Sequence, residues 1–236
     1  MADFTVTDGQ DPFLHVSLKQ GESVFAERDA MVMMDGTLDL TGNVQGGLLS
    51  GIARRLVAGE SLFTQKIEAK RGDGDVLLSQ IVPGGLHVFE VGSRQYKLSD
   101  GAFLAAETSV DIKVRTQSLG GALFGGTGGF FFIMETAGAG KLCGGGFGSL
   151  FLLDIKHGQN PLIDNGHVIA WDANLAYEMT EATSRSGGII SNLVSSQTSG
   201  EGLVMRFSGE GKVLVCSRQR SGFTAWLRQQ LNLTRA

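Results

Sequence analysis

Three acidic residues occupy the same place in three similar stretches of the sequence, and they are the first candidates for chemistry. Asp35, Glu107 and Asp172 each follow a short apolar run and stand three residues before the next strand pattern. If they converged near a pseudo-threefold axis, such carboxylates could bind a cation or act as a general acid and base. Equivalent positions in tandem units usually lie apart, so we favour a structural role in which each carboxylate accepts backbone N–H groups of the following turn.

Two glycine-rich turns resemble phosphate-binding loops only superficially. Gly138-Ala139-Gly140-Lys141-Leu142 lacks the earlier glycine of that motif and has leucine where the magnesium-binding hydroxyl belongs. The segment Gly209-Glu210-Gly211-Lys212-Val213 fails on the same grounds. Both segments predict hairpin turns.

The sequence contains no motif for nucleophilic catalysis or metal binding. There is no Gly-x-Ser-x-Gly motif and no Cys-x-x-Cys pair, and neither Cys143 nor Cys216 has a histidine nearby in sequence. The four histidines are far apart and show no metal-ligand spacing: His15, His87, His157 and His167. We therefore assign no catalytic, cofactor-binding or metal-binding residue and predict a protein that is not an enzyme.

The elements that must position these residues are β-strands. Apolar and polar residues alternate with period two in the segments that begin at Leu14, Val110 and Leu175, which predicts half-buried strands. Short continuous apolar runs predict strands covered on both faces, and they span residues 76–78, 130–134, 150–153 and 213–216. The only helical pattern is in the tail, where Phe223, Trp226, Leu227 and Leu231 predict one apolar stripe.

Self-comparison indicates an internal repeat. The three acids are 72 and 65 residues apart, and two further landmarks keep the same order. One is a double glycine before apolar residues, at Gly46-Gly47, Gly120-Gly121 and Gly187-Gly188. The other is a Gly-x-Gly turn that enters a strand, at residues 72–74, 138–140 and 209–211. Three landmarks in one order predict a triplicated unit of about 70 residues.

Units of this size are close to the lower limit for an independent core, so we expect them to pack on one another and share sheets. The first and last edges of such a chain stay open, and an open edge is satisfied by pairing with another strand. Pairing between copies of the same chain closes a ring. The repeat therefore predicts a homo-oligomer.

Composition and charge restrict the class of protein. The chain has 236 residues, 42% of them hydrophobic and 19% charged, which is enough for a buried core. The formal charge is −4, so the protein as a whole is not a basic nucleic-acid binder. A local excess of five positive charges runs from Arg206 to the end. It could face phosphates or an anionic surface, but we favour a solvated face or a complement to an acidic surface on a neighbouring subunit.

The first residues and the cysteines favour a cytoplasmic protein. The start Met-Ala-Asp-Phe has neither the charge nor the apolar stretch of a targeting segment, and two cysteines do not make a disulfide framework. The uncharged run 116–134 has the length of a membrane span, but its six glycines oppose a spanning helix. We interpret it as two strand pieces joined by a loop.

The ordered set of double glycines, Gly-x-Gly hairpins and the segments 59–63 (Gly-Glu-Ser-Leu-Phe) and 200–204 (Gly-Glu-Gly-Leu-Val) resembles a known family. This is the family of the altered inheritance of mitochondria protein 24, also called the mitochondrial biogenesis family, and the resemblance covers about residues 14–222. The sequence departs from eukaryotic members in lacking a presequence. It also departs in the middle unit, which has Gly126-Thr127-Gly128-Gly129 in place of a Gly-Glu start.

The resemblance implies an all-β chain of three tandem β-sandwich domains similar to the tryptophan RNA-binding attenuation protein, related to short double-stranded β-helices. It also implies a trimer that forms a ring of nine such domains, and it supplies no cofactor and no catalytic residues. The expected divisions are a first unit over 1–85, a second over 86–155, a third over 156–222 and a tail over 223–236.

We therefore expect a non-catalytic ring-forming scaffold or binding protein, with an unidentified protein partner as one further possibility. Three alternatives stay open. One is the binding of a ligand or single-stranded RNA between units, although no Lys or Arg pair repeats from unit to unit. The others are peripheral membrane association through Phe124 and Phe130 to Phe132 combined with the basic C-terminal region, and an enzyme site at a unit or subunit boundary.

Overall fold

The computed structural model describes residues 1–42, 64–118, 130–181 and 203–231. Within them the chain is almost entirely antiparallel β-structure, with one short 3-10 turn, η1 (Asn165–His167), and one helix, α3 (Arg220–Gln230). The expectation of an all-β fold with a short C-terminal helix is confirmed. The double-glycine landmarks, the segments 59–63 and 126–129 and Phe124 lie outside the described residues.

The strands follow one another along the molecule in three blocks of six, preceded by a separate first strand, β1 (Asp3–Val6). Block 1 contains β2 (Leu14–Leu18), β3 (Ser23–Glu27), β4 (Met31–Met34), β5 (Leu38–Gly42), β6 (Thr64–Ala69) and β7 (Gly74–Leu78). Block 2 contains β8 (Leu86–Val91), β9 (Tyr96–Ser99), β10 (Phe103–Glu107), β11 (Val110–Ser118), β12 (Phe130–Gly138) and β13 (Gly140–Gly145). Block 3 contains β14 (Leu150–Ile155), β15 (Leu162–Asp164), β16 (Val168–Asp172), β17 (Ala176–Glu181), β18 (Leu203–Ser208) and β19 (Gly211–Cys216).

The same pairings occur in each block. The last strand pairs with the first and the third, as in β7 with β2 and β4, β13 with β8 and β10, and β19 with β14 and β16. The fifth strand pairs with the second and the fourth, as in β6 with β3 and β5. Each third strand also carries a register shift at the same point of its pairing, which is typical of a β-bulge.

Neighbouring blocks are joined edge to edge. The second strand of one block pairs with the third strand of the next, β3 with β10 and β9 with β16. These junctions complete two six-stranded sheets, β5-β6-β3-β10-β13-β8 and β11-β12-β9-β16-β19-β14. The halves at the two ends of the chain stay smaller, as the four strands β1-β2-β7-β4 and the three strands β15-β18-β17.

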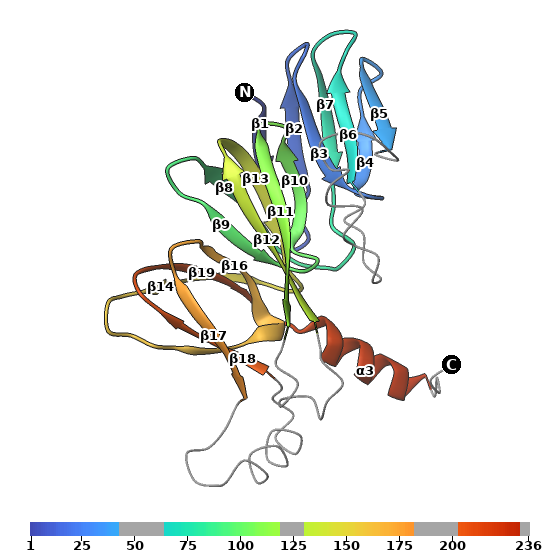
Figure 1. Cartoon of the computed structure of the whole chain (residues 1–236). Helices are drawn as coiled ribbons and strands as arrows, with labels where there is room; N and C mark the ends of the chain where they lie inside the picture. The colour runs from blue at the N-terminus through green and yellow to red at the C-terminus, as the bar shows by residue number, and fades with distance from the viewer. Residues whose placement is uncertain (43–63, 119–129, 182–202, 232–236) are drawn as a thin grey trace, which may run out of the picture.

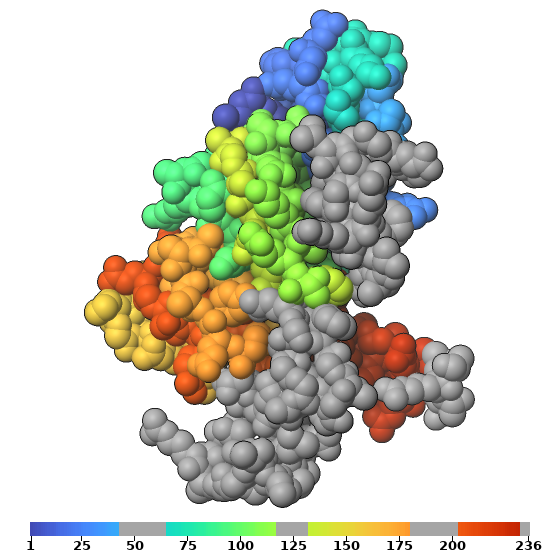
Figure 2. Space-filling model, in the orientation of Figure 1, coloured from blue at the N-terminus to red at the C-terminus, as the bar shows by residue number. Residues whose placement is uncertain are grey.

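Figure 1 shows β2 to β7 at one end of the molecule, β14 to β19 at the other and block 2 between them. Because β14 pairs with β19, residues 150–155 belong to block 3, and the division expected after residue 155 moves to the turn before β14. The helix begins at Arg220, so the tail starts three residues before the expected position. In Figure 2 the helix projects from the body of the molecule.

The links between blocks cross one another closely. Gly84 precedes β8 and forms a parallel bridge with Gly148, which precedes β14. Gly84 has φ +152°, and a Cβ there would stand 2.1 Å from the carbonyl oxygen of Gly146. Glycine is therefore required at Gly84 by both the backbone angle and the close approach of the second link.

Three apolar clusters form the core. The first lies in block 1 and takes in Leu86 and Cys143 from block 2; the second joins blocks 2 and 3; the third lies in block 3 around Trp171 and Phe207 and takes in Ile133 from block 2. All three clusters thus cross a block boundary, which couples neighbouring blocks through buried apolar area. One expected buried strand is not buried, because Phe151 and Leu152 of β14 are 65% and 39% exposed.

Candidate functional site

The three repeated acids make the same hydrogen bond in each block. Each ends or directly follows the third strand, and a carboxylate oxygen accepts the backbone N–H of a residue near the start of the last strand: Asp35 from Asp75 at 2.8 Å, Glu107 from Lys141 at 2.7 Å and Asp172 from Lys212 at 2.9 Å. The structural role that we favoured fits this arrangement, although the donor lies in a distant strand and not in the following turn. Such charge-assisted bonds fix the end of one strand to its neighbour.

The acids do not come together as a metal or catalytic cluster, since each stays in its own block. In the described part of the chain, no group of three or more histidine, cysteine or acidic residues could hold a metal ion. The surroundings of the acids differ, however. Glu107 and Asp172 are 6% and 8% exposed, whereas Asp35 is exposed.

The histidines and cysteines are equally scattered. His15 lies 3.4 Å from Asp75, and His167 bonds through Nδ1 to the carbonyl oxygen of Cys216 at 2.8 Å. Burial raises the pKa of both the Cys143 and the Cys216 thiols, so both are poor nucleophiles near neutral pH. Neither cysteine is bonded to the other, as expected for buried thiols.

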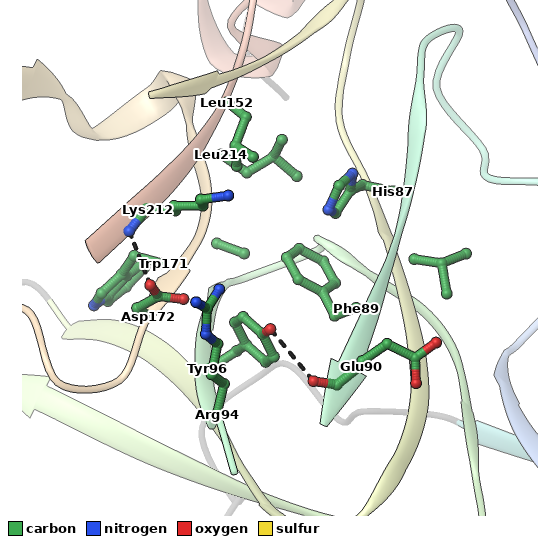
Figure 3. A pocket seen from close by; sticks show the side chains of 12 residues that line it. His87, Phe89, Glu90, Arg94, Tyr96, Leu152, Trp171, Asp172, Lys212 and Leu214 are labelled. Carbon is green, nitrogen blue, oxygen red and sulfur yellow. Dashed lines mark hydrogen bonds between the residues drawn. The ribbon is translucent and has the colours of Figure 1, made fainter. Parts of the chain in front are cut away.

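A cleft of about 240 Å³ lies at the boundary of blocks 2 and 3. In Figure 3 His87 and Phe89 lie on one side of it with Tyr96 below, and Trp171 lies on the opposite side with Leu152 and Leu214 above. The first group comes from β8 and β9, and the second comes from β14, β16 and β19. Phe89 packs against His87 and Tyr96, with ring centroids 4.7 and 4.8 Å apart. The cleft is therefore an aromatic groove along the outer side of β8, which is the last strand of its sheet.

Charged groups of both signs border this groove. Lys212, Arg94, Glu90 and Asp172 line it, and neither Lys212 nor Arg94 forms an ion pair with a residue in the described ranges. Burial lowers the pKa of His87, and the nearby positive charge of Lys212 lowers it further. His87 is therefore predominantly neutral near pH 7. The groove offers two cations, one buried carboxylate and an aromatic wall.

A second candidate surface is formed by the two outer edges, β4 and β15. The third strands of blocks 2 and 3, β10 and β16, are buried at every residue, whereas β4 has Val32 54% and Met33 41% exposed. Leu162 of β15 is 53% exposed. Each of these strands is the last in its sheet. Exposed apolar edges of this kind are sites at which another strand pairs.

The basic residues near the C-terminus do not gather on one described element. Arg206 faces Glu178 at 3.7 Å, Arg218 lies over the ring of Phe147, and Arg220 donates to the carbonyl oxygen of Gly101. Helix α3 contacts the β-structure through Arg220 and through the packing of Phe223 against Phe147, while Trp226 is 54% exposed. None of the helices in the described ranges has the length and apolarity needed to cross a membrane.

Comparison with known proteins decides the relationship. The model of the family described as mitochondrial biogenesis AIM24 matches residues 4–218. The chain belongs to this family. An uncharacterized protein of Streptococcus pyogenes serotype M6 is 34% identical over 228 residues, which cover 94% of this chain and 88% of that protein.

A solved structure supports the fold of the chain. The crystal structure of a protein from Streptococcus pyogenes is 31% identical, covers 98% of this chain and all of that one, and superposes with a TM-score of 0.79. The resemblance that the sequence suggested is thus confirmed as family membership. The relative found by sequence is itself described as uncharacterized, so it supplies no activity.

Sequence reasoning did not find the groove beside β8. Lys141 and Lys212 each follow a Gly-x-Gly turn by one residue, and this spacing was available as a signal. Trp171 stands directly before one of the repeated acids, a place that also carried information. What the sequence does not supply is the pairing that brings β8 beside block 3.

Proposed function

We propose that this AIM24 family member is a non-catalytic, cytoplasmic scaffold that assembles head to tail into a closed ring of three copies. In this proposal each block is one β-sandwich unit similar to the tryptophan RNA-binding attenuation protein, as the family resemblance implies. The observation that carries the proposal is the burial of the third strands. β10 and β16, each covered by the preceding block, are wholly buried, and the uncovered β4 exposes Val32 and Met33.

A second copy of the chain offers a strand that could pair with the outer edge of β4. Within the chain, β3 covers β10 and β9 covers β16, and the second strand of block 3, β15, covers nothing in the described chain. Pairing of β15 with β4 of the next copy would join the four-stranded and the three-stranded half-sheets into one sheet. This contact uses two different surfaces, so repetition closes a ring when the rotation between copies permits it.

The register of the contact follows from the inner junctions. At the junction of blocks 2 and 3, Leu98 pairs with Ala170 and Lys97 pairs with Trp171. In block 3, Ile163 and Leu162 of β15 occupy the places of Leu98 and Lys97, because β15 pairs with β18 as β9 pairs with β12. The strand β4 corresponds to β16 through Met34, which precedes Asp35 as Trp171 precedes Asp172. The proposed junction therefore sets Leu162 opposite Met34 of the next copy.

Light scattering after size exclusion tests the ring. The wild-type chain is expected to elute with three times the 25.0 kDa mass of one chain. Leu162→Asp and Met33→Asp place a charge in the junction and are expected to give a folded monomer with an unchanged circular dichroism spectrum, because both side chains are exposed in the single chain. Ile81→Asp is the matched control, since Ile81 is 83% exposed and lies on a link outside β4 and β15. A wild-type monomer at micromolar concentration would contradict the proposal.

A further inference from the structure

The N-terminal strand shows how an added strand binds this fold. β1 pairs antiparallel with the outer side of β2, with Phe4 opposite Val16, and it also lies against β8 of the next block. Phe4 of β1 and Ala2 directly before it are 7% and 2% exposed. β1 therefore fills a groove at the boundary of blocks 1 and 2, and it is not one of the six strands of a block.

Two polar contacts hold β1 in that groove. The backbone N–H of Ala2 donates to Glu107 Oε1 at 2.7 Å, and Lys141 Nζ lies 3.0 Å from Asp3 Oδ1. Glu107 is the repeated acid of block 2, and its other oxygen accepts the N–H of Lys141. The acid and the lysine thus form a fixed pair that recognises the start of an extended segment through one backbone donor and one carboxylate.

The same pair stands at the next boundary with no strand beside it. Asp172 accepts the backbone N–H of Lys212, as Glu107 accepts that of Lys141. β8 has the pairing partner in its block that β2 has in the first block, and its outer side pairs with no strand in the described chain. The cleft of about 240 Å³ lies along this outer side, with Asp172 and Lys212 in its lining.

The side chains of the cleft suit a strand with the pattern of β1. β8 pairs with β13 in the same register in which β2 pairs with β7. In this register Phe89 is equivalent to Val16, and Glu90 is equivalent to Ser17. A residue in the position of Phe4 would enter the aromatic groove beside Phe89 and Leu214 (Figure 3). Lys212 is available to an acidic residue one position earlier.

We propose that the outer edge of β8 binds an extended peptide segment of a partner protein by strand addition. The segment carries an acidic residue followed by an aromatic one, with the acid on Lys212, the aromatic ring in the cleft and a backbone N–H on Asp172. This mode takes its affinity from main-chain hydrogen bonds and its specificity from alternate side chains. The site lies within one chain, so it does not depend on the proposed ring.

A labelled peptide with the sequence of residues 1–7 is the probe, and fluorescence anisotropy with the full chain is the measurement. Saturable binding is expected. Lys212→Glu is expected to weaken it about tenfold, and a peptide with Asp3→Lys is expected to prefer this variant over the wild type. Lys212→Gln, which introduces no new charge beside Asp154, is expected to weaken binding about threefold. A peptide with Phe4→Ser is expected to lose measurable binding.

Position is tested separately, because the peptide could displace the chain's own β1. A benzophenone side chain in place of Phe4 is expected to cross-link to β14 or β19, and Lys141→Glu, the matched control, is expected to leave peptide affinity unchanged. Cross-linking to β2, loss of affinity in Lys141→Glu with no loss in Lys212→Glu, or no saturable binding at millimolar peptide would each overturn the proposal. Equal affinity for free phenylalanine would overturn it in favour of a small-molecule site.

Discussion

The inner block junctions and the outer edges of the chain use equivalent strands in different surroundings. β10 and β16 pair edge to edge with β3 and β9 and are buried throughout, whereas β4 has no strand on its outer side among the described residues and remains partly exposed. The repeated acids follow the same division, since Glu107 and Asp172 are buried and Asp35 is exposed. The difference shows that burial of the third strand depends on pairing with the preceding block. The apolar residues of β4 are typical of a strand whose outer edge is paired.

The largest expected effect comes from the residue that precedes the repeated acid. Trp171→Ala removes a side chain that is 1% exposed and packs against Tyr177 and Phe207, so we expect it to lower the free energy of unfolding by about 3–5 kcal/mol. Met34→Ala, at the equivalent place on the outer edge, is expected to cost about 1 kcal/mol in a monomeric background carrying Leu162→Asp. Urea unfolding measures both, and equal costs would contradict the division between inner and outer strands.

The acids offer a second, smaller comparison. Glu107→Gln replaces one of the two accepting oxygens with an NH2 donor, so one of the backbone N–H groups of Ala2 and Lys141 loses its acceptor in a buried place, and we expect a loss of about 1–3 kcal/mol. Asp35→Asn weakens one bond at an exposed place, and its effect on unfolding in the same monomeric background is expected to be smaller. A larger loss of unfolding free energy in Asp35→Asn than in Glu107→Gln would show that burial does not determine how much this hydrogen bond contributes to stability.

The smallest expected effect is a pH dependence at the first junction. Burial raises the pKa of Glu27 at the end of β3, while Arg220 partly opposes the shift and Asp100 adds to it. The folded chain therefore holds this proton more tightly than the unfolded chain, and stability is lost as pH rises through the range between the two pKa values. Glu27→Gln is expected to raise the melting temperature at pH 7 and to match the wild type below about pH 4, where the glutamate is protonated.

The matched control for that measurement is Glu210→Gln, because Glu210 is an exposed residue of the last hairpin. Its melting temperature is expected to follow that of the wild type across the same pH range. If Glu27→Gln instead destabilises the chain at pH 7, the electrostatic attraction of Arg220 outweighs the cost of burying the carboxylate.

Much of the fold could be predicted because local patterns in the sequence specify it. The alternation that begins at Leu14 became β2, and the apolar stripe around Trp226 became α3. The three acids were found by spacing alone, and their structural role was favoured over a cation site. Their actual donors were not predicted, since the N–H of Lys141 or Lys212 belongs to a strand that is distant in sequence.

The parts that were missed depend on pairing over long distances. Residues 150–153 have the composition of a buried strand, yet β14 ends its sheet and exposes Phe151. The place of β1 was missed as well, because a four-residue strand has too little sequence to indicate which edge it joins. With that docking unknown, the uncovered groove at the next boundary had no reason to be sought.

The most direct test of the account is a disulfide across the proposed ring junction. The double variant Met34→Cys and Leu162→Cys sets one cysteine on each outer edge, at positions that the inner junctions predict to be opposite one another. Mild oxidation is expected to yield dimers and trimers linked between chains on non-reducing gels, and neither single variant should do so. Chains that stay unlinked, or that link equally when Leu162→Cys is replaced by Ile81→Cys, would contradict the ring.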